Sequence, residues 1–275
     1  MTLQIGLDVT ALEGDQRTRG MGRVAQAYFE QLSQESEIEL VPYSRGDFPR
    51  LNSNGKYGWT DELFDPLKLA WFLRKDPPDL VQILDPMKVP SFSSVPVITM
   101  VHDLIPYLYR ERYQTSIWSW FLHWRMKRQI ARSGYIITPS RCTADDLTML
   151  FEIDQEKIEP VYHGINHDRF YPREADEVEE VRERYHIQTP FVLMVADLRQ
   201  YDPRKKLEDV VEAWDDQLLS GVDLVVVGQQ GEYSQRLRDR WTGPDRELVM
   251  PGFVNDDELA SLYTGAEMLL FPSRY

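Results

Sequence analysis

The sequence predicts an α/β protein made of two domains, each built around a parallel β-sheet. Short apolar runs of strand length alternate with helical patterns along the chain, which is typical of βαβ units. Several of these runs are continuously apolar, as strands of a parallel sheet are when helices cover both faces. The chain of 275 residues is long enough for two such domains.

The expected strands fall into two groups, and a charged stretch separates them. That stretch, Pro172–Tyr185, consists mostly of Glu, Asp and Arg. We place the boundary there, which gives domains of residues 1–171 and 172–275. The strands expected in the first domain are Leu3–Val9, Ile38–Tyr43, Leu80–Leu84, Val97–Val101, Tyr135–Pro139 and Ile158–Tyr162. Those expected in the second are Phe191–Ala196, Asp223–Val227, Leu248–Met250 and Glu267–Phe271.

Helical patterns and one loop lie between the strands. A long helical pattern covers Ser116–Arg132, and residues 44–60, with Gly, Pro, Asn and Ser, are expected to form a loop. A further helix is indicated by apolar residues at helical spacing, namely Val24, Ala27, Tyr28 and Leu32.

Composition excludes several classes of protein. The formal net charge is −14, which argues against a general nucleic-acid binder because such proteins need a basic face. The single Cys142 excludes an internal disulfide framework and fits a reducing cytoplasm. The first residues lack the pattern of a signal peptide, and no window approaches the roughly 20 apolar residues that span a bilayer. We therefore expect a cytoplasmic protein.

Four basic residues gather in one turn of this acidic chain. Arg199, Arg204, Lys205 and Lys206 lie between the apolar run Phe191–Ala196 and the next helical pattern. The carboxyl ends of strands in open α/β sheets bind ligands, and helix N-termini favour anions. The turn is therefore a candidate anion site, and the alternative is a solvated helix start.

Other candidates also lie at strand or helix ends. His102 follows the strand ending at Val101, where it can line a binding site or simply bond to a neighbouring loop. Asp103 can cap that loop, and Asp8 at the end of the first strand is a further candidate with a structural alternative. Gly20 and Gly22 ahead of a helix would let the backbone approach a phosphate, the alternative being a plain loop.

Five segments, taken in order, resemble the GT-B retaining glycosyltransferases of family four, the group 1 glycosyltransferases. They cover nearly the whole chain, although each is weak alone. The segments are Arg19-Gly20-Met21-Gly22-Arg23-Val24, Val101-His102-Asp103-Leu104-Ile105-Pro106, Ile136-Ile137-Thr138-Pro139-Ser140, Val161-Tyr162-His163-Gly164-Ile165-Asn166 with Phe170 after it, and the basic turn followed by Pro251-Gly252-Phe253-Val254 and Leu259-Ala260-Ser261-Leu262-Tyr263.

The resemblance implies two Rossmann-like domains with a nucleotide-diphosphate sugar bound between them, and transfer of the sugar to an acceptor with retention. It matches Lys205 to the diphosphate-binding Lys and Arg199 to its partner, with Arg204 as the alternative. It implies that His102 binds a hydroxyl of the donor sugar and that His102 and Asp103 are the catalytic residues. Further residues that it implies are Gly20 and Gly22 at the donor diphosphate or acceptor, and Asp8, Arg23 and Ser140 in the cleft or at the acceptor.

Neither a metal nor another cofactor is expected. Fixed Arg and Lys can stabilise the negative charge that builds on the leaving diphosphate, and the chain has no Asp-x-Asp motif. His163 and His167 are four residues apart, but Gly164 and the lack of a helical pattern between them argue against a shared metal.

The family's sequence continues into a Glu-Gly-Phe-Gly segment that binds the donor, and this chain stops at Tyr275. We therefore expect an incomplete second domain, weak activity of the isolated chain, and an exposed sheet edge that favours association into an oligomer. The alternatives are a non-catalytic nucleotide- or sugar-binding fragment, a GT-B sugar-nucleotide epimerase or phosphorylase, and, more distantly, a Rossmann oxidoreductase.

The helix at residues 116–132 combines Ile117, Trp118, Trp120 and Trp124 with a basic end. It can dock on an anionic membrane at the inner face. The expected acceptor is a sugar or a lipid-linked acceptor. The alternative is a core helix with a solvated basic end.

Overall fold

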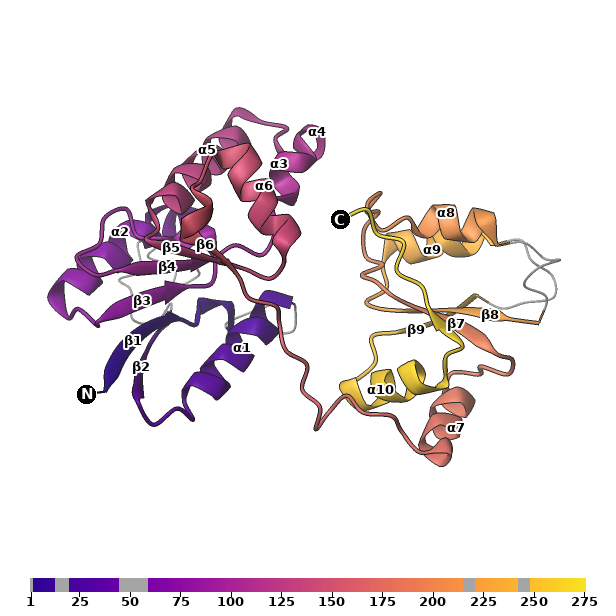
Figure 1. Cartoon of the computed structure of the whole chain (residues 1–275). Coiled ribbons are helices and arrows are strands. Elements are labelled where there is room, and N and C mark those ends of the chain that lie inside the picture. Colours follow the sequence, from indigo (N-terminus) through magenta and orange to yellow (C-terminus); the bar gives the residue numbers. More distant parts are fainter. Residues whose placement is uncertain (1, 13–19, 45–58, 215–220, 242–247) are drawn as a thin grey trace. The chain divides into compact units, whose positions relative to one another are not determined.

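The computed structural model describes residues 2–12, 20–44, 59–214, 221–241 and 248–275, and within the first turns of α2 it describes only the backbone of residues 59–63. The described chain forms two compact units, Met1–His163 and Gly164–Tyr275 (Figure 1). The chain thus passes from one unit to the other shortly before the charged stretch at which the sequence placed the boundary. The two units are described separately.

The first unit contains a six-stranded parallel sheet of order β2-β1-β3-β4-β5-β6. This confirms the predicted α/β class and the parallel sheet. The strands are β1 (Leu3–Asp8), β2 (Ile38–Tyr43), β3 (Leu80–Ile83), β4 (Val97–Met100), β5 (Tyr135–Thr138) and β6 (Ile158–Pro160).

Helices cover both faces of this sheet (Figure 1). They are α1 (Gly20–Leu32), α2 (Trp59–Lys75), α3 (Ile105–Leu108), α4 (Arg110–Tyr113), α5 (Ile117–Arg132) and α6 (Arg141–Phe151). Residues of β3 and the residue after it face opposite sides of the sheet: Val81 and Ile83 pack in one core cluster with Leu73 of α2, whereas Leu84, directly after β3, packs in another with Ala25 of α1. The alternation follows from the two-residue period of a strand.

Two segments differ from the sequence-based prediction. The expected loop at 44–60 overlaps α2, because Trp59 and Thr60 already belong to this helix, and residues 45–58 lie outside the described part. Pro66 inside α2 disguises the helix in the sequence, since proline usually ends one. Gly20 and Gly22 form the first turn of α1 rather than a loop ahead of it.

The second unit contains a four-stranded parallel sheet of order β10-β7-β8-β9. Its strands are β7 (Phe191–Val195), β8 (Asp223–Val227), β9 (Leu248–Gly252) and β10 (Met268–Leu269), and its helices are α7 (Ala175–Arg184), α8 (Leu207–Ala213), α9 (Glu232–Arg240) and α10 (Asp256–Gly265). Within β8, Leu224 and Val226 pack in one core cluster with Leu237 of α9, and Val225 and Val227 pack in the other with Leu262 of α10.

The charged stretch forms helix α7 of the second unit. Val181 is its buried residue, and it belongs to the core cluster that includes Phe191 and Leu262. Arg184 forms ion pairs with Glu180 of its own helix and with Glu258 of α10. The charged sequence thus forms a helix that packs on the second unit through a narrow apolar stripe and is joined to α10 by ion pairs. Composition alone had indicated a domain boundary in this stretch.

Candidate active site

Polar residues follow several neighbouring strands of the first sheet. Because all strands of this sheet are parallel, their carboxyl ends lie along one edge. Asp8 ends β1, His102 follows β4, Ser140 follows β5 and His163 follows β6, while Asp85 lies after β3. The first sheet thus collects these side chains, distant in sequence, at one edge.

His102 has one ring nitrogen bonded and one without a partner. Its imidazole forms a hydrogen bond with the backbone of Leu84, at the end of β3. Within the described residues, Nε2 of His102 is buried and has no hydrogen-bond partner. The bond to Leu84 must therefore use Nδ1–H, because a carbonyl only accepts. In the neutral ring, Nε2 is then an acceptor that can take a ligand hydroxyl.

His163 lies beside His102. The two ring centroids are 5.9 Å apart with the planes tilted by 38°. Burial is the main cause that lowers the pKa of His102, and the charge of His163 lowers it further, against the opposing effects of Asp103, the Leu84 bond and Asp85. Partial burial also lowers the pKa of His163, although the residue as a whole is exposed. Both rings therefore favour the neutral form, which keeps Nε2 of His102 an acceptor.

Asp103 and Ser140 hold the backbone near His102. Asp103 is exposed, and its Oδ1 accepts from the Ile105 amide at 3.0 Å. Ser140 is the N-cap of α6, where its Oγ accepts from Thr143 N at 3.1 Å. The Thr143 hydroxyl in turn donates to the His102 carbonyl at 3.4 Å. Both residues thus make local contacts that fix the turns around His102.

Asp8 belongs to a buried polar cluster at the end of β1. Its Oδ1 accepts from Thr10 N at 3.0 Å and from Thr10 Oγ1 at 2.6 Å. The ammonium of Lys88, also buried, donates to Thr10 Oγ1. Burial raises the pKa of Asp8, opposed by the charge of Lys88 and by the Thr10 bonds. The sequence reading missed Lys88, because a Lys in a polar turn is ordinarily exposed.

The remaining first-unit candidates lie on the first turn of α1. Gly20 and Arg23 are exposed, and Gly22 is buried. A Cβ at Gly20 would meet nothing within 4 Å, so the fold does not require glycine at this position.

The basic turn lies after β7 in the second unit, as predicted from the sequence. Two aspartates each serve an arginine two residues later. Asp197 accepts from Arg199 N at 3.0 Å and pairs with its guanidinium, and Asp202 accepts from Arg204 N at 3.1 Å and from Arg204 Nε at 3.0 Å. The Arg199 side chain is 37% exposed and that of Arg204 only 14%. Arg199 is therefore the more accessible of the two.

Lys205 differs from its basic neighbours. Lys206 pairs with Asp209 at 2.6 Å and precedes α8 in a left-handed conformation, with φ of 56°. Among the described residues, Lys205 has no carboxylate partner, and its ammonium lies 5.9 Å from the ring centroid of Phe271. Lys205 thus presents a charge that no acidic group of the described chain neutralises.

Two glycines that the sequence reading missed bring a second loop against this turn. A Cβ at Gly228 would lie 1.7 Å from the Ala196 carbonyl oxygen, and one at Gly231 would lie 2.7 Å from Arg199 Cα. Leu198 N also donates to Gln229 O at 2.9 Å. The loop after β8 therefore supports the backbone that carries Arg199. A Gly-x-x-Gly spacing directly after an apolar strand was the available signal.

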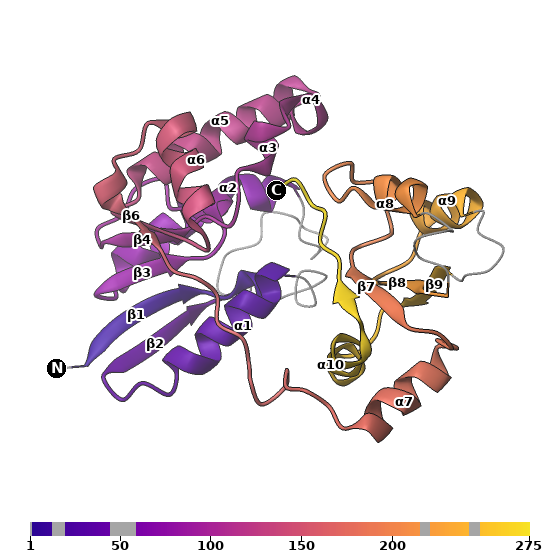
Figure 2. The same ribbon diagram turned by 45° about the vertical axis from the view of Figure 1, so that its right-hand side comes forward.

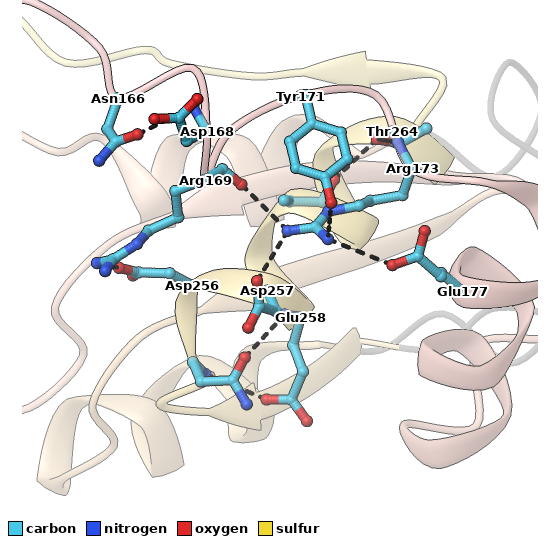
Figure 3. Close-up of polar contacts among 12 residues, drawn as sticks. Asn166, Asp168, Arg169, Tyr171, Arg173, Glu177, Asp256, Asp257, Glu258 and Thr264 are labelled. Atoms are coloured by element: carbon cyan, nitrogen blue, oxygen red, sulfur yellow. Dashed lines mark hydrogen bonds and ion pairs between the residues drawn. The ribbon is translucent and has the colours of Figure 1, made fainter.

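A polar network fastens the start of the second unit to α10 (Figure 3). The guanidinium of Arg173, whose side chain is only 7% exposed, donates to Asp257 at 2.8 Å and to Tyr171 Oη at 2.8 Å. Arg173 N donates to Thr264 Oγ1 at 3.1 Å, and Arg169 pairs with Asp256 at 2.8 Å. These contacts make residues 169–173 part of the second unit.

The described residues show neither a cluster of metal ligands nor a membrane-spanning helix, but they do form a shallow hollow. They contain no group of three or more His, Cys, Asp or Glu side chains placed to hold a metal ion. None of the described helices has the length and apolar character needed to cross a bilayer. A shallow hollow of about 420 Å³ beside the Arg173 network is lined mainly by aromatic and small residues: Phe170, Tyr171, Pro172, Ala260, Tyr263 and Thr264.

Comparison with known families decides the relationship of this chain. Residues 23–169 match the model described as glycosyltransferase family 4, and residues 189–275 match that of the glycosyl transferases group 1. The chain belongs to glycosyltransferase family 4. The predicted resemblance to the group 1 glycosyltransferases is thereby confirmed.

Curated relatives of this family 4 chain include bacterial mannosyltransferases. The serotype-specific mannosyltransferase WbdA of Escherichia coli is 23% identical over 184 residues, which are 64% of this chain and 22% of WbdA. The O-antigen chain mannosyltransferase RfbU of Salmonella typhimurium is 23% identical over 177 residues, 63% of this chain and 44% of RfbU. The chain thus spans less than half the length of either relative.

Solved structures share the fold. Sucrose-phosphate synthase from Thermosynechococcus elongatus has a TM-score of 0.69 at 16% identity, covering 99% of this chain and 76% of that one. HepE of Anabaena in complex with UDP-glucose has a TM-score of 0.66 at 15% identity, covering 98% and 74%. A glycosyltransferase from Rickettsia africae has a TM-score of 0.63 at 19% identity, covering 99% and 73%.

Proposed function

We propose that this family 4 chain takes part in hexosyl transfer from a nucleotide-diphosphate sugar to an acceptor, with retention at the anomeric carbon. The observation that carries the proposal is the basic turn after β7, where Lys205 has no carboxylate partner among the described residues and Arg199 is partly exposed. Positive charge fixed at the carboxyl end of a parallel strand suits the diphosphate of such a donor.

The chemistry needs this charge at the leaving group. As the bond between the sugar and the diphosphate breaks, negative charge grows on the departing oxygen, and fixed cations there lower the barrier. Lys205 supplies a point charge, and the Arg199 guanidinium supplies directed N–H donors. Retention would follow from attack on the same face of the sugar, assisted by the leaving phosphate.

His102 is proposed to bind a hydroxyl of the donor sugar. The support is its orphan Nε2, which is buried and held as an acceptor by the Nδ1–H bond to Leu84. Asp103 and Ser140 would act by bracing the turns around His102, and Asp8 would act through the buried cluster at the same edge of the sheet. The first turn of α1, with Gly20, Gly22 and Arg23, would contact the donor diphosphate or the acceptor.

The relatives support the substrate class. HepE was solved with UDP-glucose, and WbdA and RfbU are mannosyltransferases, so a nucleotide-linked hexose is the donor that we propose. The acceptor is proposed to be a sugar or a lipid-linked sugar.

The test is the His102→Ala variant. A lost hydrogen bond to the reacting sugar should lower kcat by about tenfold to a hundredfold while the melting temperature and the affinity for UDP stay unchanged. The rate of sugar release from UDP-hexoses, with and without acceptor, is measured beside His167→Ala, which removes an exposed histidine of the second unit. A much lower melting temperature with poor UDP binding would make His102 a structural brace, and an unchanged kcat would contradict its role at the donor sugar.

We also propose that the protein is cytoplasmic and that α5 contacts the inner face of an anionic membrane. Ile117 is 88% exposed and Trp120 57% exposed, and Trp118 and Trp124 are exposed as well. Residues 113–144 contain no Asp or Glu but carry Arg125, Lys127, Arg128, Arg132 and Arg141, in a chain of net charge −14. Exposed tryptophan beside basic residues suits the boundary between lipid headgroups and acyl chains.

A further inference from the structure

The proposed chemistry assigns no role to His163. Its imidazole nevertheless lies beside His102, which is proposed to bind the donor sugar. His163 follows β6 by three residues, and Val161 N still donates to Thr138 O at 2.8 Å, which extends the pairing of β6 with β5. His163 is therefore close to the last point at which the chain is fixed to the first sheet. It is also the last residue of the first unit, because the second begins at Gly164.

We propose that His163 is a positioning residue for His102, and that it links His102 to the segment by which the chain leaves the first unit. The inference rests on the proposed function, because it concerns the residue to which that proposal gives the donor sugar.

Geometry carries the first step. The ring centroids of His102 and His163 lie 5.9 Å apart, at a tilt of 38°, so the His163 ring flanks one side of the His102 ring. Nδ1 of His102 bonds to the backbone of Leu84, directly after β3. Two contacts from two different strand ends therefore define the His102 ring, and Nε2 is the atom left without a partner among the described residues.

Charge carries the second step. The titratable groups that act on His102 are His163 after β6, Asp85 after β3 and its own neighbour Asp103; His163 lowers its pKa, and the two carboxylates raise it. Two neighbouring imidazoles disfavour a proton on either ring. His163 thus opposes the carboxylates and keeps Nε2 of His102 able to accept a hydroxyl.

His163 also lies where the chain leaves the first unit. Beyond it, Arg169 and Arg173 tie the following segment to α10 of the second unit (Figure 3). His163 thus lies a few residues before the segment that these contacts fasten to the second unit.

The decisive variant is His163→Phe, which keeps an aromatic ring against His102 but removes the charge. The titration of the His102 imidazole is followed by NMR on the 275-residue chain with labelled histidine, His102→Ala serving to assign the signal. We expect the His102 midpoint to move to higher pH in His163→Phe, because the repelling charge is gone. A midpoint that stays in place or moves down overturns the inference. This readout does not depend on transfer activity, so it stands even if the proposed function fails.

The second variant, His163→Ala, removes the ring. We expect kcat for sugar release to fall, by up to about a hundredfold as for a reacting group displaced by about 1 Å, with unchanged affinity for UDP. His163→Phe should recover most of that rate at pH 8, where both histidines are neutral. A His163→Ala chain that works at the full rate, or one that loses UDP affinity and melting temperature together with kcat, overturns the positioning role.

Discussion

At the scale of single residues, ion pairing distinguishes the four cations of the basic turn. Arg199, Arg204 and Lys206 each pair with an aspartate close by in sequence, whereas Lys205 has no carboxylate partner in the described part of the chain. The neighbouring aspartates hold the arginine side chains in place and partly neutralise their positive charge. A phosphate must therefore compete with Asp197 for Arg199, but can bind Lys205 without such competition.

Lys205→Ala should accordingly weaken binding of UDP more than Arg199→Ala does. A charge-assisted hydrogen bond to phosphate contributes about 1.5–3 kcal/mol, so Kd should rise by about tenfold to 150-fold for the lysine variant. Calorimetric titration measures both variants. Arg240→Ala is the matched control, because it removes a cation of the same unit that pairs with Glu208 and Glu212. Equal affinity in all chains would leave the turn as a solvated helix start.

At the scale of elements, α5 combines a well-defined helix start with an exposed aromatic side. Ser116 and Ser119 form a capping box, so the helix begins where the sequence predicted. Gln129 and Ile130 are its buried residues, whereas Trp118 and Trp120 are exposed near its start. Core packing therefore uses the end of α5, whereas Trp118 and Trp120 near its start remain exposed to solvent.

Trp118→Ser with Trp120→Ser should reduce binding to vesicles that contain phosphatidylglycerol by at least about tenfold, since two large apolar side chains no longer enter the lipid. Co-sedimentation measures the bound fraction, and added salt should weaken binding of the unmodified chain. Trp71→Ser removes a tryptophan that is 58% exposed on α2, and should change little. Full binding by the double variant would rule out α5 as the docking surface.

At the scale of the whole molecule, each unit has its own sheet and its own core. Leu73 is fully buried in a cluster of the first unit and Leu237 in one of the second. Leu→Ala at such a site costs about 2–5 kcal/mol. In differential scanning calorimetry, Leu73→Ala and Leu237→Ala should therefore lower different transitions. If both variants shift one common transition equally, the units unfold as a single cooperative body.

The sequence by itself determined the fold class and most of the strands. Ile38–Tyr43 and Asp223–Val227 have the predicted bounds, because apolar and β-branched residues mark strands without reference to their neighbours. It also placed the basic turn after β7 and His102 after β4, since the carboxyl ends of parallel strands are local features of the chain. It missed α2, where Pro66 and a mixed polar pattern conceal a helix.

Only the tertiary structure decided what these residues contact. The sheet order brings the end of β6 to the edge that carries His102, so His163 lies against His102 although many residues separate them. The bond from His102 to Leu84 likewise depends on the pairing of β3 with β4. The physical reason is that a strand pattern specifies burial but not the neighbouring strand, and the chemical state of a side chain depends on its neighbours.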